Sequence, residues 1–566
     1  MAEKPLDYLT SRGVLLRDEA RWYPIFDLSA VAGLETHITA PAGWEAVTSG
    51  DLVERVAGGE KTTFLWRTAR PVPSRSLAAG PLHVFTLRLD GTDFHIYLAH
   101  ADEALASSLA HRLNDILRFY GERFGAYPWP RYSVVEGIPQ PAGKTGYSAP
   151  GFLVASITAL RNQRFLKHDP QFLPHEVAHQ WFPGEVTMAS ETDAFIAESL
   201  AEYCALLYLE RLLPAEEFQA FVRRNYLAAL TGDLIPLAPG LRLFAWYDWP
   251  TVYRTLYERG LLVHRTLHTL LGDDAFLRLL REFYFRFRGR TASVDDFRKL
   301  AEEIHGAPLA WFFDYYLKGT ELPEMNLRFE KTEQGTTSHL RVGSVPAEFV
   351  LPVELEIRDA EPRDQAGRDT AARLLLGAHT GDNIFTSPET ARDFDVVIDP
   401  AWKILFWREE VKRNRAIVRL LERSTAASAN GRLHAAQRAL QRALSDDPSD
   451  LARQQMWIYF TLGRLYFRQQ RYGLTLATLS RALKLEGYDP SLTQMVHAWA
   501  RVFRGYALEH TGQRRRALAE YRKARDEAES PVLESPFGLE EFDRITTAER
   551  EIAERLAHPL PPGRAK

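Results

Sequence analysis

Three features are scarce in this sequence, and each absence excludes a class of protein. Cys204 is the one cysteine among 566 residues, so neither an internal disulfide framework nor a multi-thiolate metal site can form. No run reaches the roughly 18–20 apolar residues that span a bilayer, and the opening MAEKPLDYLTSRG lacks the apolar core of a signal peptide. The net charge of −4 gives no reason to expect nucleic acid or a basic membrane-binding face.

These absences leave the cellular compartment open. We expect a soluble chain with no transmembrane segment and no nucleic-acid partner. A single cysteine fits a reducing compartment such as the cytoplasm. It also fits a bacterial envelope, if the chain is excised from a longer tethered protein.

Four segments of different pattern follow one another along the chain. Short alternating runs between Pro and Gly clusters fill residues 1–98, and apolar residues at helical spacing fill residues 99–320. The strand pattern returns in residues 321–409, and residues 410–566 are helical and repetitive. Because single cores rarely grow beyond about 250–300 residues, we predict a multidomain α+β protein. Its parts are an N-terminal β-sandwich, a mainly α domain, a small β-sandwich and a C-terminal α-helical repeat domain.

Small residues recur at fixed places in the last segment. The two sets, seven residues apart, are Ala436, Thr475 and Ala517, then Ala443, Ala482 and Ala524. This pattern resembles tetratricopeptide repeats, in which helix pairs stack closely. Gly463 and Gly505 are however 42 residues apart, against about 34 in a regular repeat. Two interpretations stay open: packing against the rest of the chain, or a surface for a protein partner.

One short motif carries chemistry. His175-Glu176-Val177-Ala178-His179 is H-E-x-x-H within a helical pattern. Four helical residues advance about 6 Å, so both imidazoles leave the same face, as two neighbouring zinc ligands require. Glu176 is then placed to accept a proton from a metal-activated water. The alternative is an ordinary helix with two polar residues and a core-facing remainder.

A catalytic zinc needs a third protein ligand besides a water. Eighteen residues separate His179 from Glu198 in the next helical segment. This arrangement resembles the gluzincins of the aminopeptidase N type, whose HExxHQWF…WLNEGFAEY stands here as HEVAHQWF…AFIAESLAEY. The resemblance implies a thermolysin-like catalytic domain with one Zn²⁺ per chain, held by His175, His179 and Glu198, and with Glu176 as general base.

The resemblance extends to both sides of the zinc motif, over about residues 14–410. Tyr257-Glu258-Arg259-Gly260 looks like the family's Tyr-x-Lys-Gly, whose tyrosine stabilises the oxyanion. Tyr253 is less favoured because no glycine follows it at that spacing. Upstream, RWYPIFD at residues 21–27 looks like the family's Arg-x-Phe-Pro-Cys-x-Asp.

Departures from the family concern the third ligand and the substrate amine. Ala197 and Ser199 replace the family's Asn and Gly beside Glu198. The family's Gly-x-Met-Glu-Asn, which binds the free amine, should fall within residues 143–152, yet no acid occurs between residues 137 and 168. Asp18 and Glu19 lie near the second amine-binding position without matching it. Specificity is therefore predicted to be looser, as in a relaxed exopeptidase or an endopeptidase.

The sequence alone leaves two candidate functions, which belong to different classes. The favoured one is a zinc metallopeptidase, aminopeptidase-like, acting on peptides or proteins. The alternative is a catalytically weak or inactive zinc-binding scaffold that binds partners through its helical repeats. Glu202, one turn beyond Glu198, is assigned to the second shell or to a helix surface.

Overall fold

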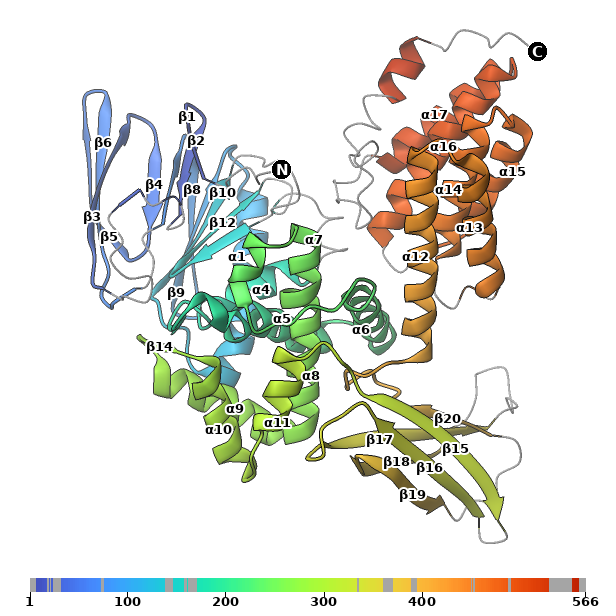
Figure 1. Cartoon of the computed structure of the whole chain (residues 1–566). Helices are drawn as coiled ribbons and strands as arrows, with labels where there is room; N and C mark the ends of the chain where they lie inside the picture. Colours follow the sequence, from blue (N-terminus) through green and yellow to red (C-terminus); the bar gives the residue numbers. More distant parts are fainter. Residues whose placement is uncertain are drawn as a thin grey trace.

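The structure is a computed structural model of the whole chain. It describes residues 7–17, 20, 22–23, 32–72, 76–137, 146–156, 160, 170–332, 335–359, 370–387, 394–448, 450, 454–486, 490–528 and 552–558. Figure 1 shows a strand-rich N-terminal part, a helical centre, a small strand-rich part and an array of C-terminal helices. Among the described residues, no helix combines the length and apolar content that a membrane crossing requires.

The N-terminal part is a β-sandwich, as predicted. One sheet has the order β1 (Tyr8–Thr10), β2 (Gly13–Leu16), β7 (Leu77–Gly80), β4 (Glu45–Thr48), and the other has the order β3 (Glu35–Pro41), β6 (Lys61–Arg67), β5 (Asp51–Gly58). Alternate residues of β6 point inward, so that Phe64 and Trp66 are buried. They join Ile38 and Val47 in one apolar cluster, which is the core that period-two patterning predicts.

A mixed sheet leads into the helical centre. Its order is β11 (Gly146–Ala149), β12 (Phe152–Ser156), β10 (Arg131–Gly137), β9 (Thr92–Leu98), β8 (His83–Leu89). Strand β10 runs parallel to β9 and β12, whereas β11 runs antiparallel to β12 at the sheet edge. Strands β8 and β9 lie within residues 1–98 and yet share this sheet with β10, β11 and β12. The domain divisions at 98, 320 and 409 stay predictions.

The helical centre contacts the edge strand β11 through α4 (Phe172–Ala178). Its elements are α1 (Glu103–Phe124), α4 (Phe172–Ala178), β13 (Val186–Met188), η2 (Glu191–Ile196), α5 (Glu198–Leu212), α6 (Ala215–Ala229), η3 (Gly240–Ala245), α7 (Trp249–Val252), η4 (Tyr253–Arg259), α8 (Gly260–Leu271), α9 (Asp273–Phe287), β14 (Arg290–Ala292), α10 (Val294–His305), α11 (Ala310–Phe313) and η5 (Asp314–Lys318). Helices α4 and α5 are buried on nearly all sides, which places polar side chains on them inside the protein.

The helical pattern of the centre is interrupted at two places. Between η2 and α5 it breaks at Ala197, whose φ of −120° and ψ of −82° lie outside the helical region. Before α8 it contains a π-helical turn, η4. The first interruption lies next to the candidate site residue Glu198, and the second contains the candidate site residue Tyr257.

The small strand-rich part is also a sandwich. Its sheets have the orders β15 (Glu324–Thr332), β16 (Gly335–Gly343), β19 (Gly381–Ser387) and β18 (Thr370–His379), β17 (Val350–Asp359), β20 (Phe394–Ile398). Leu340, Leu351 and Leu355 are fully buried and belong to the same apolar cluster as the helical centre. The small sandwich therefore shares its core with the helical centre.

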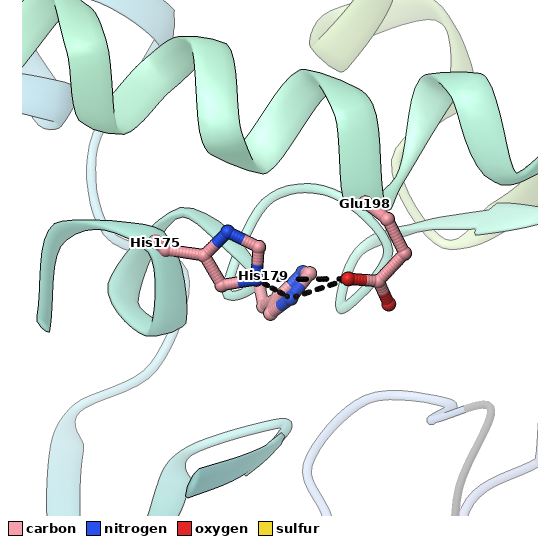
Figure 2. Close-up of side chains that lie close together, drawn as sticks. All are labelled: His175, His179 and Glu198. Carbon is pink, nitrogen blue, oxygen red and sulfur yellow. Dashed lines mark hydrogen bonds and ion pairs between the residues drawn. The ribbon is translucent and has the colours of Figure 1, made fainter. Parts of the chain in front are cut away.

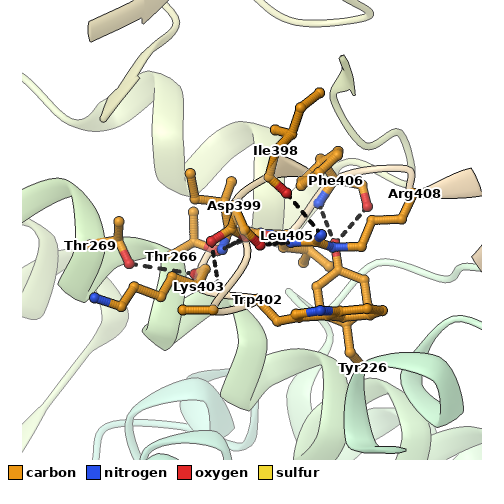
Figure 3. A network of polar contacts seen from close by, with 12 residues as sticks. Tyr226, Thr266, Thr269, Ile398, Asp399, Trp402, Lys403, Leu405, Phe406 and Arg408 are labelled. Carbon is orange, nitrogen blue, oxygen red and sulfur yellow. Dashed lines mark hydrogen bonds and ion pairs between the residues drawn. The ribbon is translucent and has the colours of Figure 1, made fainter. Parts of the chain in front are cut away.

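A network of polar contacts lies where this sandwich, the helical centre and the C-terminal helices meet (Figure 3). Buried Arg408 donates to the Asp399 carboxylate over 2.5 Å. That carboxylate also accepts the backbone N–H groups of Lys403 and Ile404. The Tyr226 hydroxyl of α6 accepts the Phe406 N–H over 2.7 Å. Residues 399–408 are thus held by hydrogen bonds among themselves and by a hydrogen bond to Tyr226 of α6.

The C-terminal helices pack as pairs, consistent with the predicted repeats. They are α12 (Glu409–Ala429), α13 (Leu433–Asp446), α14 (Gln455–Arg468), α15 (Tyr472–Ala482), α16 (Pro490–His510) and α17 (Arg514–Ala528). The recurring small residues are all fully buried: Ala436, Ala443, Thr475, Ala482, Ala517 and Ala524. A Cβ on Gly463 would lie 2.4 Å from Leu479, and one on Gly505 would lie 2.1 Å from Tyr521. Glycine at these points lets the paired helices approach closely.

Candidate metal centre

Three side chains from two helices converge inside the helical centre (Figure 2). His175 and His179 extend from α4 and its C-terminal end, and Glu198 is the first residue of α5. Their nearest ligand atoms all lie within 4.8 Å of one another. The break at Ala197 starts α5 at Glu198 and so brings this carboxylate to the two imidazoles.

The spacing of these atoms fits a tetrahedral metal ion. The two Nε2 atoms are 2.9 Å apart, and Glu198 Oε2 is 3.6 Å from His175 Nε2 and 3.5 Å from His179 Nε2. Zinc bonds of about 2.0–2.1 Å in a tetrahedron place neighbouring ligand atoms about 3.3 Å apart. Two imidazoles and one carboxylate are also a donor set that catalytic zinc sites use.

The other nitrogen of each imidazole is oriented by a neighbour. His179 Nδ1 lies 2.9 Å from the Phe182 carbonyl oxygen, to which it donates, and this fixes the tautomer that leaves Nε2 free as a ligand. His175 Nδ1 lies 3.6 Å from Glu202 Oε1, which is an ion-pair distance. Hydrogen bonds such as that of His179 hold ligating imidazoles in place and raise their basicity. Glu202 is buried, with its carboxylate facing His175.

The charges of the cluster favour a cation. Burial by itself lowers the pKa of His175, but the carboxylates of Glu202, Glu198 and Glu176 outweigh burial and raise that pKa to about 9. Burial likewise opposes ionisation of Glu198, yet the neighbouring His179 and His175 hold its pKa well below the ordinary value. A metal ion that binds here displaces a proton, so binding is coupled to pH.

Glu176 lies at the boundary between α4 and the edge strand β11. Its side chain is buried, and its backbone carbonyl accepts a hydrogen bond of 2.7 Å from Ser148 Oγ. A Cβ on Gly146 would come within 2.8 Å of Glu176 Oε1 and 2.7 Å of the Phe172 ring. The absence of a side chain at Gly146 therefore leaves room for the Glu176 carboxylate.

Tyr257 approaches the cluster from the π-helical turn η4. Its ring centroid is 5.9 Å from that of His175. Burial, and then the Glu198 carboxylate, raise the pKa of Tyr257 well above its ordinary value. Tyr253 stacks on Tyr257 with centroids 4.9 Å apart, and Gln171 Nε2 donates to its hydroxyl over 3.4 Å. Tyr257 therefore has its ring against that of His175.

Some predicted site features fall outside the described residues. These are the Gly-rich segment before Gly146, most of the RWYPIFD segment, and Asp18 and Glu19. The site also contains one residue whose role the sequence did not suggest: Ser199, next to Glu198, is fully buried and hydrogen-bonded to η4. In the sequence, the only sign of this role was that Ser199 stands where the family has glycine.

Comparison with known proteins finds sequence similarity that includes the helical centre. Residues 110–316 match the peptidase family M1 domain. Aminopeptidase B of Homo sapiens is 26% identical over 311 residues, covering 52% of this chain and 45% of the relative. Aminopeptidase N of Escherichia coli is 26% identical over 234 residues, covering 39% of this chain and 26% of the relative. The chain thus spans less than half the length of these relatives.

A solved structure resembles the fold of almost the whole chain. Aminopeptidase A of Legionella pneumophila, in complex with aspartic acid, matches with a TM-score of 0.59 at 13% identity. The match covers 96% of this chain and 64% of that one. At this identity the similarity concerns the fold. The predicted resemblance to the aminopeptidase N-type gluzincins is confirmed by the family match and the relatives.

Proposed function

We propose that this chain, in which residues 110–316 form a peptidase family M1 domain, is a zinc-dependent peptidase that holds its metal with His175, His179 and Glu198. The observation that carries the proposal is the triangle of ligand atoms, with edges of 2.9, 3.5 and 3.6 Å. A triangle of this size matches one face of a zinc tetrahedron.

Each remaining residue of the site has a distinct role in this proposal. Zinc, when bound, supplies a Lewis acid that polarises a peptide carbonyl and lowers the pKa of a water molecule. Glu176 accepts a proton from the attacking water and delivers it to the leaving amine. Tyr257, whose raised pKa keeps its hydroxyl protonated, donates a hydrogen bond to the oxyanion. Glu202 orients His175.

The substrate is a peptide that pairs with the edge strand β11. This strand ends the order of its sheet in the described residues, so its outer edge offers backbone groups to an extended peptide. Its residues, Gly146 to Ala149, include no acid that could bind a free amine. A buried ammonium without carboxylate partners is costly, so we propose cleavage of peptides whose amino terminus is blocked or distant from the scissile bond.

The C-terminal helices offer a separate surface for a protein partner. A groove of about 440 Å³ between α12 and α13 is lined by Arg423, Arg432, Arg438 and Arg442, with alanines between them. This charge suits an acidic peptide segment of the partner. Binding of a glutamate-rich peptide, followed by fluorescence anisotropy, should be lost in the double variant Arg438→Glu/Arg442→Glu. Equal binding by both proteins would refute this assignment.

The experiment for the peptidase proposal combines two measurements on one preparation. Zinc is counted per chain, and hydrolysis is followed for unblocked peptides and for the same peptides with an acetylated amino terminus. We expect about one zinc per chain and turnover of both peptide sets. Turnover of only the unblocked set would contradict the loose specificity. Stoichiometric zinc without any turnover would favour the scaffold alternative, and absence of zinc would contradict the whole proposal.

A further inference from the structure

We propose that Ser199 is a positioning residue that fixes Tyr257 beside the metal centre by holding the backbone of the π-helical turn η4. This inference rests on the proposed role of Tyr257 as the oxyanion donor. Ser199 follows Glu198 directly at the start of α5. One turn of α5 therefore supplies a metal ligand and a contact to the element that carries the tyrosine.

The first observation is an exchange of hydrogen-bond partners in η4. In a regular α-helix the Gly260 N–H would donate to the Leu256 carbonyl, four residues earlier. Here that N–H donates to the carbonyls of Thr255 and Tyr257 instead. The Leu256 carbonyl accepts a hydrogen bond of 2.5 Å from Ser199 Oγ. The hydroxyl thus stands in for the helical donor at the residue just before Tyr257.

The second observation is a close fit between Ser199 and Gly260. A Cβ on Gly260 would lie 2.1 Å from Ser199 Oγ and 2.5 Å from Ser199 Cβ. Ser199 is fully buried at this contact, so water cannot replace its hydroxyl. The Ser199 side chain fills the space that the missing Gly260 side chain leaves, and the fit joins α5 to the junction of η4 and α8.

The consequence concerns the geometry of Tyr257. A buried carbonyl without a donor costs about 1–3 kcal/mol, so without the hydroxyl the turn is driven toward regular α-helical pairing of Gly260 with Leu256. That change rotates Tyr257 about the helix axis and moves its ring away from His175, now 5.9 Å distant. The metal ligands on α4 and α5 keep their own contacts, so metal binding should not change.

The test is a double-mutant cycle between Ser199→Ala and Tyr257→Phe. A displacement of about 1 Å in a catalytic group can cost about 100-fold in rate, so Ser199→Ala should lower kcat by about 10- to 100-fold. KM and the zinc content should stay unchanged. In the Tyr257→Phe background the same substitution should change kcat less than about twofold, because the group that Ser199 positions is already missing. An equal loss in both backgrounds, or no loss in either, would overturn the inference.

A readout that does not depend on turnover separates this inference from the proposed function. Crystal structures of the wild type and Ser199→Ala give the Tyr257-to-His175 ring distance directly. An unchanged distance would overturn the inference even in an active enzyme, and a lengthened one would support it even in a protein without peptidase activity. Ser480→Ala is the matched control, because Ser480 Oγ also donates to a helical carbonyl, that of Leu476 in α15. It should leave kcat unchanged.

Discussion

Replacement of Arg408 by methionine should destabilise the fold more than any surface charge change. The guanidinium donates to the Asp399 carboxylate over 2.5 Å, to the Asp399 carbonyl over 2.9 Å and to the Ile398 carbonyl over 3.2 Å. The exposed fractions of the two side chains are 6% and 2%. Removal of one partner from a buried ion pair costs about 3–5 kcal/mol, because the other charge stays buried without compensation. We expect that loss in the free energy of unfolding, measured in urea.

The pH dependence of the loss identifies its cause. Burial raises the pKa of Asp399, and the Arg408 guanidinium opposes this rise. Without Arg408 the pKa rises further, so the folded variant binds a proton more readily than the wild type does. The deficit should therefore be largest above that pKa, where the carboxylate is ionised, and should shrink as the pH falls through it. Unfolding measured at about pH 8 and about pH 5 compares the two conditions.

A matched variant at an exposed ion pair shows whether burial is the reason for the large loss of stability in Arg408→Met. Lys412 forms an exposed ion pair with Glu409 on α12, with atoms 3.0 Å apart. Lys412→Met should cost no more than about 1 kcal/mol, as exposed pairs do. If Arg408→Met also cost less than about 1 kcal/mol, or lost the same amount at both pH values, the reasoning from a buried pair would be wrong.

Three further predictions concern the metal centre. Glu202→Gln, which weakens the contact to His175 Nδ1, should lower zinc affinity by about 10- to 100-fold in competition with a chelator; unchanged affinity would show that Glu202 does not support His175 as a ligand. Gly146→Ala, whose Cβ would crowd Glu176 and Phe172, should lower kcat with zinc retained, and full activity would contradict the proposed place of the base. Removal of zinc by a chelator should lower the melting temperature, since zinc binds only the folded site, and added zinc should restore it; an unchanged melting curve would contradict a buried metal site.

The parts of the site that local geometry decides were predictable from the sequence. The helical repeat alone places His175 and His179 on one face, and the structure brings their Nε2 atoms within 2.9 Å. Glu198 followed from the family spacing. The break at Ala197 and the π-helical turn at Tyr257 did not follow from local periodicity. At the turn, the Leu256 carbonyl accepts a hydrogen bond from Ser199 Oγ, which is 57 positions away in the sequence.

The fold was predictable where one face of a strand is buried and the other exposed. Strand β6 alternates in this way and lies where its pattern predicts. Strands β18 and β19 follow this pattern less closely, because each carries a large apolar residue on its exposed face. Leu375 in β18 is 74% exposed and Ile384 in β19 is 65% exposed. Such residues remove the alternation on which the prediction of a half-buried strand depends.

The most direct test of the account compares Glu176→Gln with the wild type. Zinc per chain and peptide turnover are measured together, with exposed Glu191→Gln as the control. We expect Glu176→Gln to retain about one zinc and to lose hydrolysis by at least about 100-fold, because the general base is gone while the ligands remain. The control should keep both. Undiminished hydrolysis in Glu176→Gln, with its zinc in place, would contradict the proposed peptidase mechanism.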